Sequence, residues 1–536
     1  MSYHALVQPL RTLMLTSSTF ADRRALWAFA LGVGAVTAGV VLHMPMFLMG
    51  RAIHYRLAGM SMAIGMYIGM GLIIGGVGIA AYGLLPRKIS VARAAVSNIV
   101  VAAPEDAALG PAHWWLMIVL TIALVIDVMK PAALGFAVPG MAGEYGVPKS
   151  TASFVAFFAL IGTVMGSIMW GTLADIYGRK ATILLSAVLF VGTAICGAMP
   201  DLRWNIFMCF MMGAAAGGML PVTYALLAEM MPSRHRGWSL VLVGGLGAIG
   251  GYFAASGASA LWQSTYSWRI LFLLNLPTGL ALVLLGNFIP ESAKFLIARG
   301  RTNEAHQVME RFGAVARKTT AAVAHTGHSQ LKGFDLWGKL GALSLAALSW
   351  GLINFGLLLW LPGHLQEKGY SVGLTSKLLA ESALISFPTV FVCALMYSRW
   401  STKWSLATMI GFTIIGLLAI LEFELVGGMP VLPVTLILVG SNGTLAVLLP
   451  YTAESFPLNV RGRTTGWIAA CTKAGGVGAQ TLSINALVPP MDWVAILIVL
   501  PAVAALGLIA WFGKETRGSD LRVLDPDGHV FAGTGL

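Results

Sequence analysis

The sequence predicts an all-α protein that crosses a membrane many times. Of its 536 residues, 57% are hydrophobic and 10% are charged, whereas a soluble protein carries about 25% charged residues. The apolar residues gather in runs of roughly 20 or more, which is the length that a helix needs to cross a bilayer. The Lys and Arg residues cluster in the short segments between these runs, as expected where positive charge sets the orientation of a membrane protein.

Fourteen apolar runs fit this pattern. Two of them lead the chain, at about 25–49 and 57–85, and a polar linker follows at about 86–113. The twelve later runs are predicted to span the membrane at roughly 114–138, 151–173, 181–199, 205–230, 238–262, 269–289, 338–362, 372–397, 404–424, 431–455, 464–487 and 492–513. An even number of crossings places both termini on one side. With the termini and the long polar stretch in the cytoplasm, roughly 25 of the 34 Lys and Arg residues lie inside.

These runs predict five parts of the chain. They are an N-terminal extension with two spans (1–112), a first six-helix half (113–289), a cytoplasmic central loop (290–337), a second six-helix half (338–513) and a cytoplasmic tail (514–536). Within the central loop, Thr302–Gly313 is expected to form a short amphipathic helix that is capped by Thr302 or Asn303.

The second leading run is rich in glycine. Gly65 and Gly69, and again Gly71 and Gly75, have the small-xxx-small spacing of closely packed membrane helices. The two leading spans have no counterpart among the twelve that follow. They either pack against one half or mediate oligomerisation, and the sequence alone does not choose between these alternatives.

Composition also argues against nucleic-acid binding, metal binding and disulfide bonds. The net charge of +12 would suit nucleic acid, but the basic residues form no face interleaved with aromatics, and no zinc-ligand spacing occurs. The four cysteines all lie in apolar runs without CxxC spacing, so we interpret them as small core residues; they are Cys196, Cys209, Cys393 and Cys471.

An internal repeat indicates the architecture. The pattern A-E-x-x-P-x-x-x-R-G begins at Ala228 and again at Ala453, 225 residues later. Both copies close a fourth span and open a fifth within a set of six, which predicts two six-helix halves with parallel pseudo-symmetry. Their Glu and Arg residues at cytoplasmic helix ends can pair reversibly, as a gate requires; they are Glu229, Arg236, Glu454 and Arg461.

Further motifs give a resemblance to a known family. The stretch 171–180, with Asp175 and Arg179, resembles the G-x-x-x-D-x-x-G-R-K loop of the major facilitator superfamily. The stretch 290–305 resembles the P-E-S-P-R-x-L…G-R…E-A signature of its sugar-porter-like members, and 514–518 resembles their P-E-T-K-G ending. The resemblance covers about 113–521 and implies the major facilitator fold, in the branch of sugar, metabolite and organic-ion transporters. It adds Asp175 and Arg179 to the expected cytoplasmic gate.

The first core span carries two opposite charges near mid-membrane. Asp127 and Lys130 stand three residues apart, hence on one helix face, and Pro131 follows. By insertion scales each charge costs about 2.5–3.5 kcal/mol at this depth, and the proline removes a backbone hydrogen bond, so we expect a kinked or loosened helix. Charged and interrupted helices at this depth favour a cavity or a pathway.

The same span resembles, without gaps, the D-G-x-D…G…P span of aromatic-acid and metabolite proton symporters. Lys130 stands where those proteins have their second Asp, and Cys209 stands where they have an Arg in the fourth span. The usual proton-coupling pair is therefore altered. Asp127 is a candidate proton carrier or, alternatively, the structural counter-ion of Lys130.

Other polar residues at depth are candidates for substrate binding. Lys473 in the eleventh core span either meets an anionic substrate, as basic residues do in similar organic-anion members, or snorkels to the cytoplasmic interface. Asn354 and Asn442, with the neighbours Ser441 and Thr444 of the latter, either orient a substrate or bond adjacent helices. Tyr224 and Trp350 are candidate cavity aromatics, with helix packing as the alternative.

The expected function is secondary active transport of a small organic solute, by alternating access, across the cytoplasmic (inner) membrane. Two membrane-buried lysines favour an aromatic or aliphatic carboxylate, with a proton gradient as the candidate driving force, no cofactor or metal, and a monomer as the transport unit. The alternatives are a neutral sugar or polyol porter, an efflux pump, and a transporter-like sensor or scaffold. No nucleotide loop, metal cluster or nucleophile–base pair suggests an enzyme.

Overall fold

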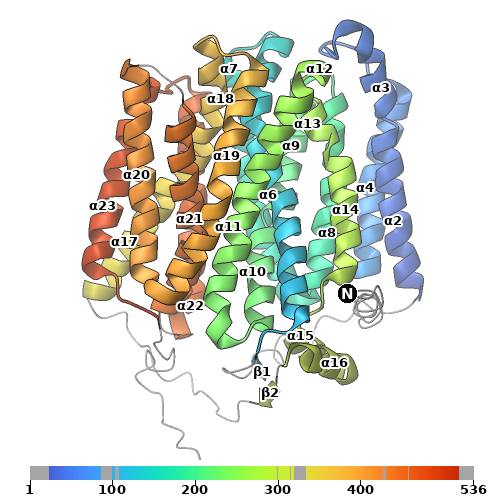
Figure 1. The fold of residues 1–536 in the computed structure, drawn as a ribbon. Coiled ribbons are helices and arrows are strands. Elements are labelled where there is room, and N and C mark those ends of the chain that lie inside the picture. The colour runs from blue at the N-terminus through green and yellow to red at the C-terminus, as the bar shows by residue number, and fades with distance from the viewer. Residues whose placement is uncertain are drawn as a thin grey trace, which may run out of the picture.

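The computed structural model describes residues 23–85, 99–102, 108–298, 300–313, 315–318, 334–426, 430–456 and 458–517. Nearly all of these residues are helical, and the long helices run side by side (Figure 1). Thirteen helical segments in the described ranges are long and apolar enough to cross a membrane. The remaining predicted span, 464–487, corresponds to α22 (Leu458–Ile484), a helix of 27 residues that is less apolar than its neighbours.

The first half begins with α6 (Pro111–Tyr145), which stays helical through Pro131 and Pro139. Its other helices are α7 (Lys149–Tyr177), α8 (Arg179–Gly192) continued by η2 (Thr193–Ala198), α9 (Leu202–Ala216), α10 (Met219–Met230), α11 (Ser233–Ala258) continued by η3 (Ser259–Gln263) and α12 (Ser264–Tyr266), then α13 (Ile270–Leu273), α14 (Asn275–Leu285) and η4 (Gly286–Phe288).

The second half repeats this order of six spans. They are formed by α17 (Phe334–Leu352) with η5 (Ile353–Leu357) and α18 (Leu358–Glu367), α19 (Val372–Leu395) with η6 (Met396–Trp400), α20 (Thr402–Val426), α21 (Val431–Ser455), α22, and α23 (Met491–Phe512). The three segments η3, η5 and η6 are π-helices, a form that often marks functional sites.

The two halves meet along three sets of helices. α11 contacts α19 and α21, α7 contacts α22, and α6 contacts α18. The apolar core runs through this junction, because Leu160 of the first half clusters with Trp350, Phe355 and Leu445 of the second. The junction is therefore formed by the helices that carry the buried charges.

The N-terminal extension consists of α2 (Arg23–Val41), α3 (Met44–Met49), η1 (Gly50–Ile53) and α4 (Ile64–Leu84). α2 and α4 pack with their backbones almost touching. A Cβ on Gly32 would lie 2.6 Å from the carbonyl oxygen of Gly76, and one on Gly69 would lie 2.7 Å from that of Gly39. Of the predicted glycine pairs only Gly69 serves this packing, since the other three have open space around them. The contact follows a seven-residue spacing instead.

The extension packs against α8 of the first half (Figure 1). Phe29, Val36, Ile73 and Ala80 join an apolar cluster with residues of α8. All residues of α8 except Leu189 are consequently buried. The extension thus packs on the first half through α8.

A buried ion pair fastens the extension at the other end of the bundle from β1 and β2. Glu144, at the end of α6, accepts hydrogen bonds from Arg269 Nη2 at 2.6 Å and from the backbone N–H groups of Leu57 and Ala58 at 2.6 and 3.1 Å. The indole of Trp268 donates to its second oxygen at 2.9 Å. Both charged side chains are almost fully buried, Arg269 completely. The sequence alone does not indicate that these two charges pair.

At the same end of the molecule as β1 lie α15 (Ala293–Ala298) and α16 (Thr302–Phe312) (Figure 1). The predicted amphipathic helix is confirmed as α16, although no side chain caps it and its N-cap residue is Arg301. β1 (Ile99–Ala102) from the linker pairs antiparallel with β2 (Val315–Lys318) from the central loop, with Ile99 opposite Lys318. The sequence had not suggested that these two segments meet.

Candidate functional site

The buried charges of α6 form the first element of the site. Lys130 Nζ lies 3.9 Å from Asp127 Oδ1, as the three-residue spacing predicts, and neither side chain is more than a tenth exposed. The ammonium also lies against the ring of Phe190 in α8. Asp127 Oδ1 has no hydrogen-bond partner among the described residues. The pair is therefore held in place by helix geometry and not by a complete polar shell.

Lys473 brings a third charge from the opposite half. Its ammonium stands 5.2 Å from the centroid of the Phe355 ring, and its electrostatic partner is Asp127. Asp127 thus interacts with one lysine of its own helix and with another from α22. The structure brings together three of the residues singled out in the sequence, across the junction of the halves.

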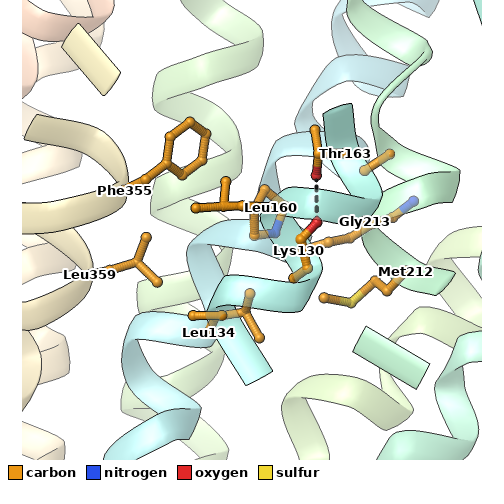
Figure 2. Close-up of a pocket in the computed structure, with 12 residues that line it drawn as sticks. Lys130, Leu134, Leu160, Thr163, Met212, Gly213, Phe355 and Leu359 are labelled. Carbon is orange, nitrogen blue, oxygen red and sulfur yellow. Dashed lines mark hydrogen bonds between the residues drawn. The ribbon is translucent and has the colours of Figure 1, made fainter. Parts of the chain in front are cut away.

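A small pocket lies beside Lys130 (Figure 2). It is lined from α6, α7 and α9 of the first half and from η5 and α18 of the second, by residues that include Lys130, Leu134, Leu160, Thr163, Met212, Gly213, Phe355 and Leu359. The volume available to the centre of a water molecule is about 10 Å³, roughly the space of one water. Lys130 is the charged residue of its lining and Thr163 adds a hydroxyl, while the other lining residues are apolar.

The predicted neutral site residues fall into two groups. The Asn354 amide donates to the carbonyl of Trp350 at 3.1 Å, inside its own helix at the start of the π-helical segment η5. Asn442 is buried, and its amide nitrogen has no partner among the described residues. Gln480 of α22, which the sequence had not singled out, donates to the carbonyl of Phe355. This bond satisfies a backbone group of η5, and a polar residue at helix depth was its only signal.

A polar network on the side of β1 and β2 is built around Arg179 and Glu229. Arg179 Nη2 lies 2.8 Å from Glu229 Oε1, and Ser292 Oγ donates to Glu229 Oε2 at 2.5 Å. Glu291 accepts from the backbone N–H of Arg179 at 2.9 Å. Burial raises the pKa of the Glu291 carboxyl. Gly178 adopts a φ of +102°, and the Glu291 carboxylate occupies the place of its Cβ, which explains the glycine of the loop motif.

The other gate candidates differ in what they contact. Glu454 accepts from Tyr397 Oη at 2.7 Å and from Thr516 Oγ1 at 2.8 Å. Arg236 interacts electrostatically with both Glu454 and Glu229, but among the described residues no ion pair within 4.0 Å joins it to either acid. Arg236 is therefore within electrostatic reach of one acidic residue from each half. The side chains of Asp175 and Arg461 lie outside the described part.

At the other end of the bundle, polar contacts join the two halves. Lys149 pairs with Glu367, Ser153 bonds Ser483 at 2.7 Å, and Ser259 bonds Ser376 at 2.7 Å. These residues were not predicted, since single serines at helix ends carry no pattern in the sequence. Together they close the junction on the side away from β1 and β2.

Comparison with known proteins agrees with this arrangement. The profile of the Major Facilitator Superfamily matches residues 120–480. The chain is 27% identical over 434 residues to the niacin transporter NiaP of Acinetobacter baylyi, covering 79% of this chain and 98% of that protein. It is 27% identical over 441 residues to the 4-hydroxybenzoate transporter PcaK of the same organism, covering 77% and 93%.

Solved structures show the same fold. The proton:xylose symporter XylE bound to 6-bromo-6-deoxy-D-glucose superposes with a TM-score of 0.61 at 17% identity, covering 76% of this chain and 97% of that one. An inward-open structure of the xylose transporter XylE from E. coli gives 0.60, also at 17% identity, covering 77% and 99%. With two six-helix halves, the loop motif around Gly178 and a matching profile over most of its length, the chain belongs to the Major Facilitator Superfamily.

Proposed function

We propose that this protein is a secondary active transporter of small organic acids and that aromatic carboxylates are its substrates. The observation that carries the proposal is the group formed by the buried Asp127 and Lys130 of the first half and the partly buried Lys473 of the second. With all three ionised, two lysines and one aspartate leave one surplus positive charge. Because an unbalanced charge inside a membrane protein is costly, a monoanion that completes the balance is the ligand that the group favours.

The aromatic part of the proposal is supported by the neighbours of Lys473. Phe355 lies beside its ammonium, and Trp350 packs edge-on against Phe355 with 5.6 Å between ring centroids. An aromatic ring whose carboxylate meets Lys473 can pack against these two rings. Similar proteins named for niacin, 4-hydroxybenzoate and benzoate transport agree with this class of substrate.

Transport itself would follow from exposing the charged group to each side in turn. The contacts Lys149–Glu367, Ser153–Ser483 and Ser259–Ser376 hold one side closed. The Arg179–Glu229 pair and Arg236 stabilise the other. Each contact is polar and near a helix end, so each can break when the halves rock.

The driving force is proposed to be an ion gradient, with no bound cofactor. Asp127 has two candidate roles. As a proton carrier it would lose its charge and strengthen the pull of the two lysines on an anion, which couples proton and substrate entry. As a fixed counter-ion of Lys130 it would leave uptake independent of a pH gradient. We place the protein in the cytoplasmic membrane as a monomeric unit with both termini in the cytoplasm.

The experiment is counterflow in proteoliposomes, with and without a pH gradient. Benzoate, 4-hydroxybenzoate and nicotinate are tested against xylose and an amine. We expect exchange of the carboxylates, loss of exchange in Lys473→Gln, and retention in the control Lys377→Gln, whose side chain is 69% exposed on α19. Exchange of xylose but not of carboxylates would replace the proposal with a sugar porter, and binding without flux would indicate a sensor.

A further inference from the structure

Two serine contacts on the side away from β1 and β2 are pseudo-symmetric counterparts. Ser259 Oγ lies 2.7 Å from Ser376 Oγ, and Ser483 Oγ lies 2.7 Å from Ser153 Oγ. Ser259 and Ser483 belong to the fifth spans of their halves and stand 224 residues apart. Ser153 and Ser376 belong to the second spans and stand 223 apart. The repeat motif recurs after 225 residues, so the fold forms the same contact twice.

In the first half, a chain of hydrogen bonds leads from this contact into the backbone of α6. Ser259 Oγ donates to Gln263 Oε1, so its oxygen accepts from the hydroxyl of Ser376. Gln263 Nε2 in turn donates to the carbonyl of Phe136 at 2.9 Å. All four residues are buried. A serine of the second half is thereby bonded, through two side chains, to the helix that carries the buried ion pair.

The second half has a similar arrangement on α22. Gln480 precedes Ser483 by three residues, so both side chains lie on one helix face. The hydroxyl of Ser483 donates to Ser153, and Gln480 Nε2 donates to the carbonyl of Phe355 at 2.5 Å. The serine contact and the glutamine are here connected through one turn of the helix. In both halves, therefore, the fifth span joins the opposite half to the backbone of its own first span.

The two carbonyls lie where the first span of each half is irregular. Phe136 stands between Pro131 and Pro139 of α6, which have no backbone N–H to donate. Phe355 lies in the π-helical segment η5. The regular ladder of backbone hydrogen bonds is weakened near such residues, so a glutamine from a neighbouring helix contributes to fixing the backbone there.

The same two stretches border the pocket beside Lys130. Leu134 of α6, Phe355 of η5 and Leu359 of α18 line it (Figure 2). Between them the backbones of α6 and α18 nearly touch, because a Cβ on Gly135 would lie 3.2 Å from the Cα and from the carbonyl oxygen of Leu359. The position of each bonded carbonyl therefore affects the width of the pocket.

We propose that Gln263 and Gln480 are positioning residues that couple the two serine contacts to the width of this pocket. The inference rests on the proposed function, because it assigns the pocket to the transported solute. The volume available to the centre of a water molecule is about 10 Å³, so an organic solute must move α6 and α18 apart to enter. This movement shifts the two carbonyls, the glutamines transmit it to η3 and α22, and the serine contacts weaken. By linkage, closing the contacts narrows the pocket.

The first test needs no ligand. Ser153→Cys and Ser483→Cys are introduced into the full-length protein, and backbone hydrogen exchange of residues 353–359 is compared between its reduced and disulfide-linked forms. We expect the link to slow exchange by about fivefold or more, and by less than about twofold when Gln480→Met is added. Methionine has a similar length but no N–H to donate, so the variant removes the bond to Phe355 with little change in packing.

The matched control is Trp170→Phe. It removes another buried bond between two spans of one half, from the indole N–H to the carbonyl of Ala214 at 2.6 Å, and should leave the slowing unchanged. The first half offers an independent version of the test if Gln480→Met does not fold. There the cysteines replace Ser259 and Ser376, the variant is Gln263→Met, and exchange is followed in residues 132–140.

The second test adds benzoate to the reduced protein with cysteines at 153 and 483. Because a filled pocket should weaken the serine contact, benzoate should slow disulfide formation by about threefold. This effect should disappear in Gln480→Met and persist in Trp170→Phe.

The outcomes separate the coupling from the proposed function. Equal slowing of exchange with glutamine and with methionine at position 480, or no slowing with either, would overturn the coupling. Faster disulfide formation in benzoate would also overturn it, because the contact would then tighten as the pocket fills. A protein with the expected exchange behaviour but no counterflow of any carboxylate would retain the coupling and overturn the proposed function.

Discussion

Replacing Glu144 with Gln should free the loop around Leu57 and Ala58 from the first half and so loosen the N-terminal extension. The carboxylate accepts four hydrogen bonds, of which those from Arg269 and Leu57 are 2.6 Å long. A glutamine has nearly the same shape but one acceptor oxygen. If that oxygen serves Arg269 and the two backbone N–H groups, the new NH₂ faces the indole N–H of Trp268, and two donors oppose each other.

The expected loss in the free energy of unfolding follows from the burial of the ion pair. The side chains of Glu144 and Arg269 are 4% and 0% exposed, so the substitution leaves a buried guanidinium without a counter-charge. Breaking a buried pair by removing one partner costs about 3–5 kcal/mol, and we expect the loss to fall in this range. The exposed pair of Lys377 and Glu381, 3.9 Å apart, gives the contrast, since exposed pairs contribute about 0–1 kcal/mol.

Two measurements follow this change in purified protein. The first is the midpoint of thermal unfolding, which should fall clearly in Glu144→Gln and hardly at all in Glu381→Gln. The second is limited trypsin digestion, because Arg51 and Arg56 are exposed next to the anchored loop and should be cut faster once the loop is free. If Glu144→Gln matches Glu381→Gln in both measurements, the ion pair does not anchor the loop and the reasoning is wrong.

Three further predictions test other contacts. Gly76→Val should separate α2 from α4, because even a Cβ there would lie 2.8 Å from the carbonyl oxygen of Gly32, whereas Gly71→Ala has open space; trypsin sensitivity at Arg56 should rise in the first variant only. Introducing cysteines at Ser259 and Ser376, whose oxygens are 2.7 Å apart, should allow a disulfide that stops counterflow until a reductant is added, and persistent flux in the cross-linked protein would refute this closure. Burial alone would raise the pKa of Glu515, but hydrogen bonds from Ser401 and Thr402 lower it to about 2. Because this pKa is lower folded than unfolded, its stabilising effect is present above the ordinary value of 4.5 and is lost as pH falls towards 2; wild type should unfold at a higher temperature than Glu515→Gln at pH 6, and the two should converge in acid.

Much of the architecture could be predicted from the sequence, because the thickness of the bilayer sets the length of every span and its apolar interior excludes most charged residues from every span. The repeat at Ala228 and Ala453 placed the halves, and the three-residue spacing of Asp127 and Lys130 placed their charges together. Lys473 could be singled out by its depth, but its meeting with Asp127 depends on how α22 packs across the junction. A contact between residues of the two halves, which are far apart in the sequence, leaves no pattern in a single sequence.

The extension shows where sequence reasoning ends. An apolar helix face looks the same whether lipid or protein covers it, so nothing in α2 or α4 pointed to α8. The predicted glycine pairs include one residue of the contact, Gly69, but not Gly76, which also lies in it. Likewise Glu144 and Arg269 are ordinary charges near predicted span ends, and only the fold makes them a buried pair. Asn354 was singled out as polar at depth, and its visible bond serves its own helix.

The cover over α8 changes what surrounds that helix. Buried residues make up 94% of the most apolar stretch of Arg179–Ala198, but 50% of that of Thr402–Phe423, its counterpart in the second half. The two pseudo-symmetric helices are therefore under different packing constraints. On α20 the lipid-facing side chains need only be apolar. On α8 nearly every side chain must also have a volume that fits its neighbours, as in the interior of a soluble protein. A saturation mutagenesis scan should show this as tolerance of large apolar residues along one side of α20 and intolerance around the whole circumference of α8.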